Sequence, residues 1–104
     1  SKEHRAFHTA LAAACGSPTL LDIRERLFDR IARYVALSIL SRAATRNDAA
    51  EHEQIMRAAL SRNGERAVVL NREHIERTAE KVLKSLATRD RSRSLRALSG
   101  KAAK

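Results

Sequence analysis

Little in this chain of 104 residues favours β-structure, a disulfide framework or a membrane span. It has one Cys, one Pro, three Gly, two Phe, one Tyr and no Trp. The lone Cys15 excludes an internal disulfide and favours a reducing cytoplasm. We expect no membrane association and no secretory leader, because no apolar run is long enough to span a bilayer and no leader pattern opens the chain.

Strong helix formers, namely Ala, Leu, Arg and Glu, are what the chain has in abundance. Their dominance predicts an all-α fold in a single domain with a modest core. The spacing of the apolar residues predicts an antiparallel bundle of about four helices. The expected helices cover about residues 2–15, 19–42, 47–62 and 65–86.

The breaks between these helices carry recognisable end signals. Gly16-Ser17-Pro18 ends the first helix, and either Ser17 or Thr19 supplies the N-cap of the second. Asn47 or Asp48 starts the third helix, which ends at Asn63-Gly64. The inward face of the third helix is expected to hold His52, Ile55, Met56, Ala59 and Leu60.

The formal net charge of +9 is unevenly distributed along the chain. Residues 88–104 carry six of the 21 basic side chains and one of the 12 acidic ones, which leaves +4 for residues 1–87. Residues 88–104 have too few apolar side chains to pack. We expect a basic, solvated and disordered tail, with electrostatic contact to phosphate as the alternative.

All four histidines fall on expected apolar faces. His4 and His8 are four residues apart and therefore share one helical face, while His52 and His74 are in phase with the apolar stripes of their own helices. A buried imidazole has two polar nitrogens to satisfy. The four side chains therefore predict a divalent metal site, and the alternative is a polar core cluster bridged by water.

Several short motifs together resemble a known family. They are Phe7-His8 followed by Leu11, the break at Gly16-Ser17, Glu51-His52 with Ile55 and Ala59, and Ala67 seven residues before His74-Ile75. In their order and spacing they resemble the FCD-type effector-binding domain of GntR-family bacterial transcription regulators. The resemblance covers roughly residues 3–83.

This resemblance implies an all-α antiparallel bundle that, in many members, holds a divalent metal through one Asp and three His. A small carboxylate effector completes the coordination. Position by position, the three His are His8, His52 and His74, whereas the family's Asp falls on His4. Four nitrogen donors favour Zn²⁺, with Ni²⁺, Co²⁺ or Cu²⁺ as alternatives, and leave the full dication charge to attract an anion. If His4 turns outward, three ligands remain.

Regulators of this family also carry an N-terminal winged helix-turn-helix, and their effector domain has six or seven helices. The chain therefore resembles a C-terminal part of such a regulator, with residues 1–87 as a partial effector- and metal-binding domain. Contact with DNA would pass through the absent N-terminal domain. The missing helices would normally cover part of the second and fourth helices. Because their apolar surface is then exposed, we expect a homodimer or another form of self-association.

Three further residues are candidates for effector binding. Arg30 could pair with an effector carboxylate through a bidentate contact, although a solvated helix face also explains it. Tyr34 and Thr78 lie on inward rows and could orient an effector or a ligand imidazole. Packing and local hydrogen bonding account for them equally well.

The predicted function is ligand sensing without catalysis, in which effector binding modulates DNA binding by the absent domain. One alternative is a metal-dependent helical enzyme, either a hydrolase or an oxygen-handling protein. It is disfavoured because Glu3, Glu51 and Glu73 each adjoin a His in sequence and so point about 100° away from it. A second alternative is a basic nucleic-acid-binding helical module.

Overall fold

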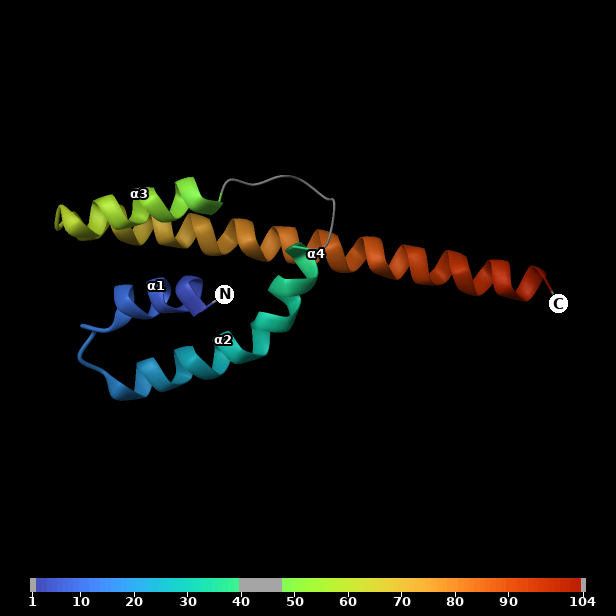
Figure 1. Cartoon of the computed structure of the whole chain (residues 1–104), viewed down its shortest axis with the longest axis horizontal. Helices are drawn as coiled ribbons and strands as arrows, with labels where there is room; N and C mark the ends of the chain where they lie inside the picture. The colour runs from blue at the N-terminus through green and yellow to red at the C-terminus, as the bar shows by residue number, and fades with distance from the viewer. Residues whose placement is uncertain (1, 40–47, 104) are drawn as a thin grey trace. The chain divides into compact units, whose positions relative to one another are not determined.

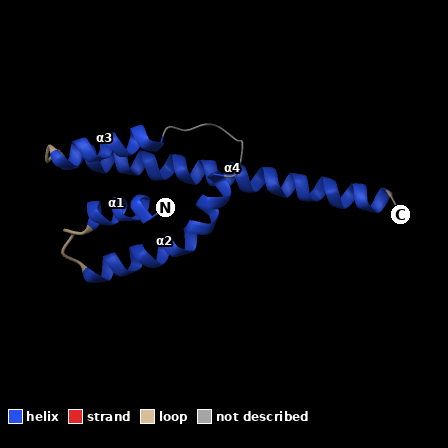
Figure 2. Ribbon diagram, in the orientation of Figure 1, coloured by secondary structure: helices blue, strands red, loops and turns tan. Residues whose placement is uncertain are grey.

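The computed structural model describes residues 2–39 and 48–103, and within them every regular element is an α-helix (Figures 1 and 2). The helices are α1 (Lys2–Ala12), α2 (Pro18–Ile39), α3 (Asp48–Leu60) and α4 (Gly64–Ala102). The predicted all-α class is confirmed. The expected end of the second helix near residue 42 and the expected start at Asn47 lie outside the described residues. No described helix is both long and apolar enough to cross a bilayer.

The chain divides into two compact units, residues 1–33 and residues 34–104. In the first unit, α1 and the first part of α2 form an antiparallel hairpin, since Arg5 contacts Asp29 while Thr9 contacts Arg24. In the second unit, α3 and the first part of α4 form another antiparallel hairpin (Figure 1). Each unit contains two of the four histidines.

The turn between α1 and α2 follows from three consecutive residues. Gly16 has a φ of +73°, a left-handed conformation that glycine adopts without steric cost. Ser17 is the N-cap, because its Oγ accepts the N–H of Leu20 at 3.2 Å. Pro18 then occupies the first helical position, where its missing N–H removes no hydrogen bond. Ser17 is therefore the cap, and the alternative of Thr19 is wrong.

The turn between α3 and α4 is a Schellman motif whose left-handed residue is an arginine. The N–H of Asn63 donates to the carbonyl of Ala58 at 2.9 Å, and the N–H of Arg62 donates to that of Ala59 at 3.0 Å. Arg62 has a φ of +59°. The side chain of Asn63 then caps α4 by accepting the N–H of Arg66 at 3.1 Å. The break predicted from the sequence is confirmed at this point.

The core of the second unit is a narrow row between α3 and α4. Ile55 and Ala58 of α3 are buried, as are Leu70 and His74 of α4. The wider inward face expected for the third helix is only partly correct, because Met56 and Leu60 are 41% and 76% exposed; Ala59 is exposed as well. A hairpin covers only one side of each helix.

Helix α4 is longer than the sequence suggested. We expected the helix to end near Leu86 and a frayed tail to follow, whereas α4 continues to Ala102. No Pro interrupts residues 87–102, and the hydroxyls of Thr88 and Ser99 each donate to a carbonyl four residues earlier. Every described side chain from residue 87 onward is exposed. The predicted boundary at residue 87 thus marks a change in burial within one helix.

The left-handed Arg62 generates a first prediction. Replacing Arg62 with Gly should raise the free energy of unfolding by about 1 kcal/mol, because a Cβ is unfavourable at positive φ. Gln54→Gly, at an exposed position inside α3, should instead lower it by about 0.5–1 kcal/mol. Urea unfolding followed by circular dichroism measures both. A loss of stability in Arg62→Gly would contradict the assigned turn.

Candidate metal centre

The second unit brings two histidines from different helices into contact. Nε2 of His52, on α3, lies 3.1 Å from Nε2 of His74, on α4. Their ring centroids are 4.6 Å apart, with an angle of 63° between the ring planes. His74 is only 4% exposed. The two imidazoles therefore present their ring nitrogens to each other within the hairpin.

The other ring nitrogen of His74 is held by a carboxylate. Nδ1 of His74 lies 3.0 Å from Oε1 of Glu51, and Nη1 of Arg77 lies 3.3 Å from the same oxygen. An ionised carboxylate only accepts hydrogen bonds, so Nδ1 of His74 carries the donated hydrogen. In the neutral ring this leaves a lone pair on Nε2, the atom directed at His52. A carboxylate in this position also fixes the orientation of the imidazole.

The separation of the two Nε2 atoms can be compared with that of two ligands on one ion. Zinc–nitrogen bonds of about 2.0–2.1 Å at a tetrahedral angle place two nitrogens about 3.3 Å apart. The observed 3.1 Å is close to this value. The same distance suits an N–H···N hydrogen bond between two neutral imidazoles. The pair therefore fits a metal, and the predicted polar cluster remains the competing interpretation.

The first unit supplies a second histidine pair on α1. The ring centroids of His4 and His8 are 4.8 Å apart and the rings are perpendicular. One ring nitrogen of each lies within 4.8 Å of the other. Both side chains are half-buried; His8 lies against Phe7, and His4 lies 6.2 Å from the ring of Phe28 on α2. The i, i+4 spacing predicted from the sequence thus produces a ring contact.

An arginine between these histidines holds α1 against α2. Nε of Arg5 donates to Glu25 at 3.1 Å and its Nη1 to Asp29 at 2.6 Å, while its guanidinium carbon lies 4.9 Å from the centroid of the Phe28 ring. The hydrogen bond from Arg5 lowers the pKa of Glu25 below its ordinary value of 4.5. Hydrogen bonds to Glu25 and Asp29 raise the pKa of Arg5. These contacts set the position of the His4–His8 pair within the first unit.

The three predicted effector contacts lie in different settings. Arg30 is exposed on α2 in the first unit, and Tyr34, 39% exposed, begins the second unit. Thr78 is half-buried, and its hydroxyl donates to the carbonyl of His74 at 2.9 Å. The structure thus gives Thr78 a local backbone partner one turn after the histidine.

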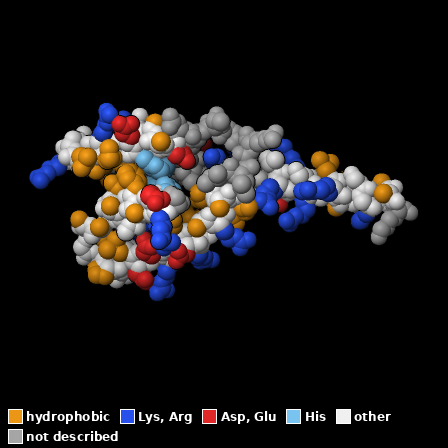
Figure 3. Space-filling model, viewed as in Figure 1, with side chains coloured by type: hydrophobic (Ala, Val, Ile, Leu, Met, Phe, Trp, Pro, Cys, Tyr) orange, Lys and Arg blue, Asp and Glu red, His pale blue; other side chains and the backbone are white. Residues whose placement is uncertain are grey.

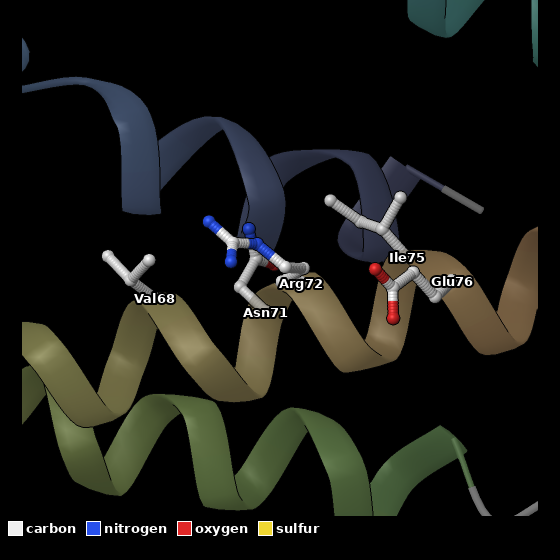
Figure 4. A pocket seen from close by; sticks show the side chains of 5 residues that line it. All are labelled: Val68, Asn71, Arg72, Ile75 and Glu76. Atoms are coloured by element: carbon white, nitrogen blue, oxygen red, sulfur yellow. The ribbon is translucent and has the colours of Figure 1, made fainter.

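A shallow pocket lies on the side of α4 that faces away from α3 (Figure 4). Its lining consists of Val68, Asn71, Arg72, Ile75 and Glu76. Within the described part of the chain, Oδ1 of Asn71 is a buried polar atom with no hydrogen-bond partner. The pocket therefore combines an apolar wall with a guanidinium, an amide and the carboxylate of Glu76.

The main residue that sequence reasoning missed is Glu51. Helical geometry does direct it away from its neighbour His52, but that same direction carries it to His74 on the facing helix. A signal was present in the sequence, because Glu51, Ile55 and Ala58 follow the i, i+4, i+7 spacing of one face. An acidic residue on a buried row requires a partner.

The comparisons with known proteins identify the family to which these helical hairpins belong. Residues 1–77 match the FCD domain family. The chain belongs to this family, the effector-binding class of GntR-family regulators that its motifs indicated. This class is regulatory and non-enzymatic, so the expectation that the chain is not an enzyme is confirmed.

Two curated relatives give the same result. The chain is 42% identical over 76 residues to the HTH-type transcriptional repressor GlaR of Escherichia coli (strain K12), covering 69% of this chain and 34% of that protein. It is 36% identical over 73 residues to the uncharacterized HTH-type transcriptional regulator BphR of Paraburkholderia xenovorans (strain LB400), covering 70% and 30%. The chain thus spans about a third of the length of these relatives. No solved structure matches it significantly.

The lowered pKa of Glu25 generates a second prediction. A carboxylate whose pKa is lower in the folded state stabilises the fold above its unfolded value, and this stabilisation is lost as pH falls through the folded pKa. Glu25→Gln should therefore be less stable than the wild type at neutral pH. Its stability should also fall less steeply below pH 4.5.

Urea unfolding across this pH range measures the difference. The control is Asp22→Asn, which removes an exposed carboxylate of the same helix that pairs with Arg26 at 3.0 Å. Exposed pairs of this kind contribute little, so the control should follow the wild-type profile. Identical acid profiles for Glu25→Gln and the wild type would contradict the role assigned to the Arg5–Glu25 pair.

Proposed function

We propose that this chain is the effector-sensing part of a cytoplasmic transcription regulator and that it binds a divalent metal. The ligands are His8, His52 and His74, with His4 as the fourth. The observation that carries the proposal is the His52–His74 pair, whose Nε2 atoms are 3.1 Å apart and whose orientation is held by Glu51. Membership of the FCD family supports it, as does similarity to two HTH-type regulators.

The proposal requires the histidine pairs of the two units to share one ion. The Nε2 atoms of His52 and His74 have a separation that fits a common ion, and the ligand nitrogens of His4 and His8 lie within 4.8 Å of each other. Four neutral nitrogen donors favour Zn²⁺ first, then Ni²⁺, Co²⁺ or Cu²⁺. They also leave the charge of the ion uncompensated, which favours an anionic effector. The bound ion would supply a Lewis-acid position for an oxygen of a small carboxylate.

The pocket on α4 is the proposed place for the remainder of that effector. Asn71 lies three residues before His74, so one edge of the pocket adjoins the row of the histidine. Arg72 offers a guanidinium that can bind a carboxylate through two hydrogen bonds. Arg72 lines this pocket, so we add it to Arg30 as a candidate cationic contact.

Effector binding would act on transcription by favouring one arrangement of the helices. A ligand shifts such an equilibrium only by its difference in affinity for the two arrangements. In the full regulator, DNA contact would belong to an N-terminal winged helix-turn-helix. A homodimer would cover the exposed apolar row of α2, where four side chains are 47–60% exposed. These side chains are Leu20, Ile23, Leu27 and Ile31.

Metal binding gives the third prediction. The purified chain should hold close to one Zn²⁺ per set of four histidines. His52→Ala and His74→Ala should each lower the affinity for Zn²⁺ in a calorimetric titration. The loss should exceed the roughly 10–100-fold that removing a supporting hydrogen bond costs. Ser85→Ala, which alters a buried side chain elsewhere on α4, should bind metal as the wild type does. If His52→Ala and His74→Ala lowered the stability of the fold but kept full affinity for the metal, the two histidines would form a hydrogen-bonded polar cluster and not a metal site.

The effector is tested by the same titration with small carboxylates, with and without a chelator. A carboxylate that binds only the metal-loaded chain would support the proposal. Its affinity should fall in Arg72→Gln and remain unchanged in Arg66→Gln, an exposed arginine of the same helix. If the carboxylate bound with equal affinity with and without metal, it would not be a ligand of the ion, and this part of the proposal would be wrong.

The contact between Glu51 and His74 gives the fourth prediction. Glu51→Gln should lower metal affinity about 10–100-fold, because an amide is a weaker acceptor for Nδ1 of His74. The matched control is Glu53→Gln, two residues further along α3, whose carboxylate pairs with the exposed Arg57 at 2.7 Å. Glu53→Gln should leave metal affinity unchanged. Equal effects of the two variants would show that overall charge, and not orientation of His74, controls binding.

A further inference from the structure

The C-terminal part of α4 extends beyond the N-terminal end of α3, the end at which α3 begins (Figure 1). Glu51, in the first turn of α3, contacts Arg77 of α4, and the last buried residue of α4 is Ser85. From residue 87 to residue 103 every side chain is exposed. We call this segment, residues 87–103, the arm. Its structure is a helix that no other described part of the second unit covers.

The arm is strongly basic, and Figure 3 shows Lys and Arg side chains along it. It carries five basic residues and one acidic residue. Arg89, Arg93 and Arg96 are spaced four and three residues apart, so they lie within an arc of about 60° and span about 10 Å of the helix axis. Unlike Arg5, Arg57 and Arg77, they form no ion pair with any described residue.

We infer that the arm binds the phosphate backbone of duplex nucleic acid through Arg89, Arg93 and Arg96. Guanidinium groups bind phosphate oxygens through paired hydrogen bonds. A duplex carries one negative charge per about 1.7 Å of axis, and neutralising phosphates releases counterions, which makes the binding favourable. Because phosphates carry no sequence information, the arm should bind duplexes of any sequence.

Two other partners fit the arm less well. If the arms of two copies paired side by side, segments with five basic residues and one acidic residue each would come together. Their like charges would repel each other. Insertion into an anionic membrane surface needs a broad apolar face with large or aromatic side chains. The arm offers only Leu95 and Leu98 as large apolar residues and has no aromatic residue. A polyanion matches both its charge and its polarity.

The test measures the binding of four versions of the chain, one of them the wild type, to a fluorescently labelled duplex of arbitrary sequence. The arm variant replaces Arg89, Arg93 and Arg96 with Gln. The charge-matched control replaces three exposed arginines near the other end of α4 with Gln, namely Arg57, Arg62 and Arg66. Anisotropy titrations between about 50 and 200 mM salt give the affinity and its salt dependence. A chelator is present throughout, so the result is independent of the metal proposal.

Three phosphate contacts predict a roughly 40-fold loss of wild-type affinity over this salt range, a slope of about −2.7 in log K against log salt. The arm variant should lose about 2–3 units of that slope, whereas the control should retain it. Replacing the same three arginines with Lys should largely restore it. Circular dichroism should show equal helicity in all versions.

Three results would overturn the inference. Equal losses in the arm variant and the control would mean that diffuse positive charge is responsible. Tighter binding of the wild type to anionic lipid vesicles than to the duplex, lost in the arm variant, would assign the arm to membranes. Concentration-dependent dimerisation that requires the arm and is unaffected by the duplex would assign it to self-association.

Discussion

A buried imidazole needs a partner for each of its two ring nitrogens, and at His74 this requirement organises the hairpin of α3 and α4. Glu51 accepts from Nδ1, and Nε2 faces His52. A buried ring nitrogen left without a hydrogen-bond partner would cost about 1–3 kcal/mol. Both partners come from α3, one residue apart, so the relative register of the two helices depends on them as well as on Ile55 and Leu70.

The first unit is held together differently. No residue of α1 is buried, and α1 and α2 are joined by the ion pairs of Arg5 with Glu25 and Asp29, by a hydrogen bond from Arg24 to Thr9, and by the contacts of Arg5 and His4 with the ring of Phe28. Exposed ion pairs are individually weak and are screened by salt. The His4–His8 pair thus rests on a more adaptable support than the His52–His74 pair.

Much of the fold could be predicted from local signals. The helical class, the break at Gly16-Ser17-Pro18 and the cap at Asn63 depend on residues close in sequence, whose preferences act without tertiary contacts. The length of α4 could not be predicted in this way. The sequence after residue 87 lacks a core-facing pattern, but it contains good helix formers and no Pro, so the helix continues without burial.

The sequence by itself determined that the chain is helical, where two of its breaks lie, at Gly16-Ser17-Pro18 and at Asn63-Gly64, and that its four histidines fall on the apolar faces of their helices, because each of these follows from spacing along the chain. It also carried the motifs of the FCD family. Only the tertiary structure decided that Glu51 contacts His74 instead of its neighbour His52, and that Arg89, Arg93 and Arg96 stand on an uncovered part of α4. These depend on which helix faces which, and spacing within one helix does not contain that information.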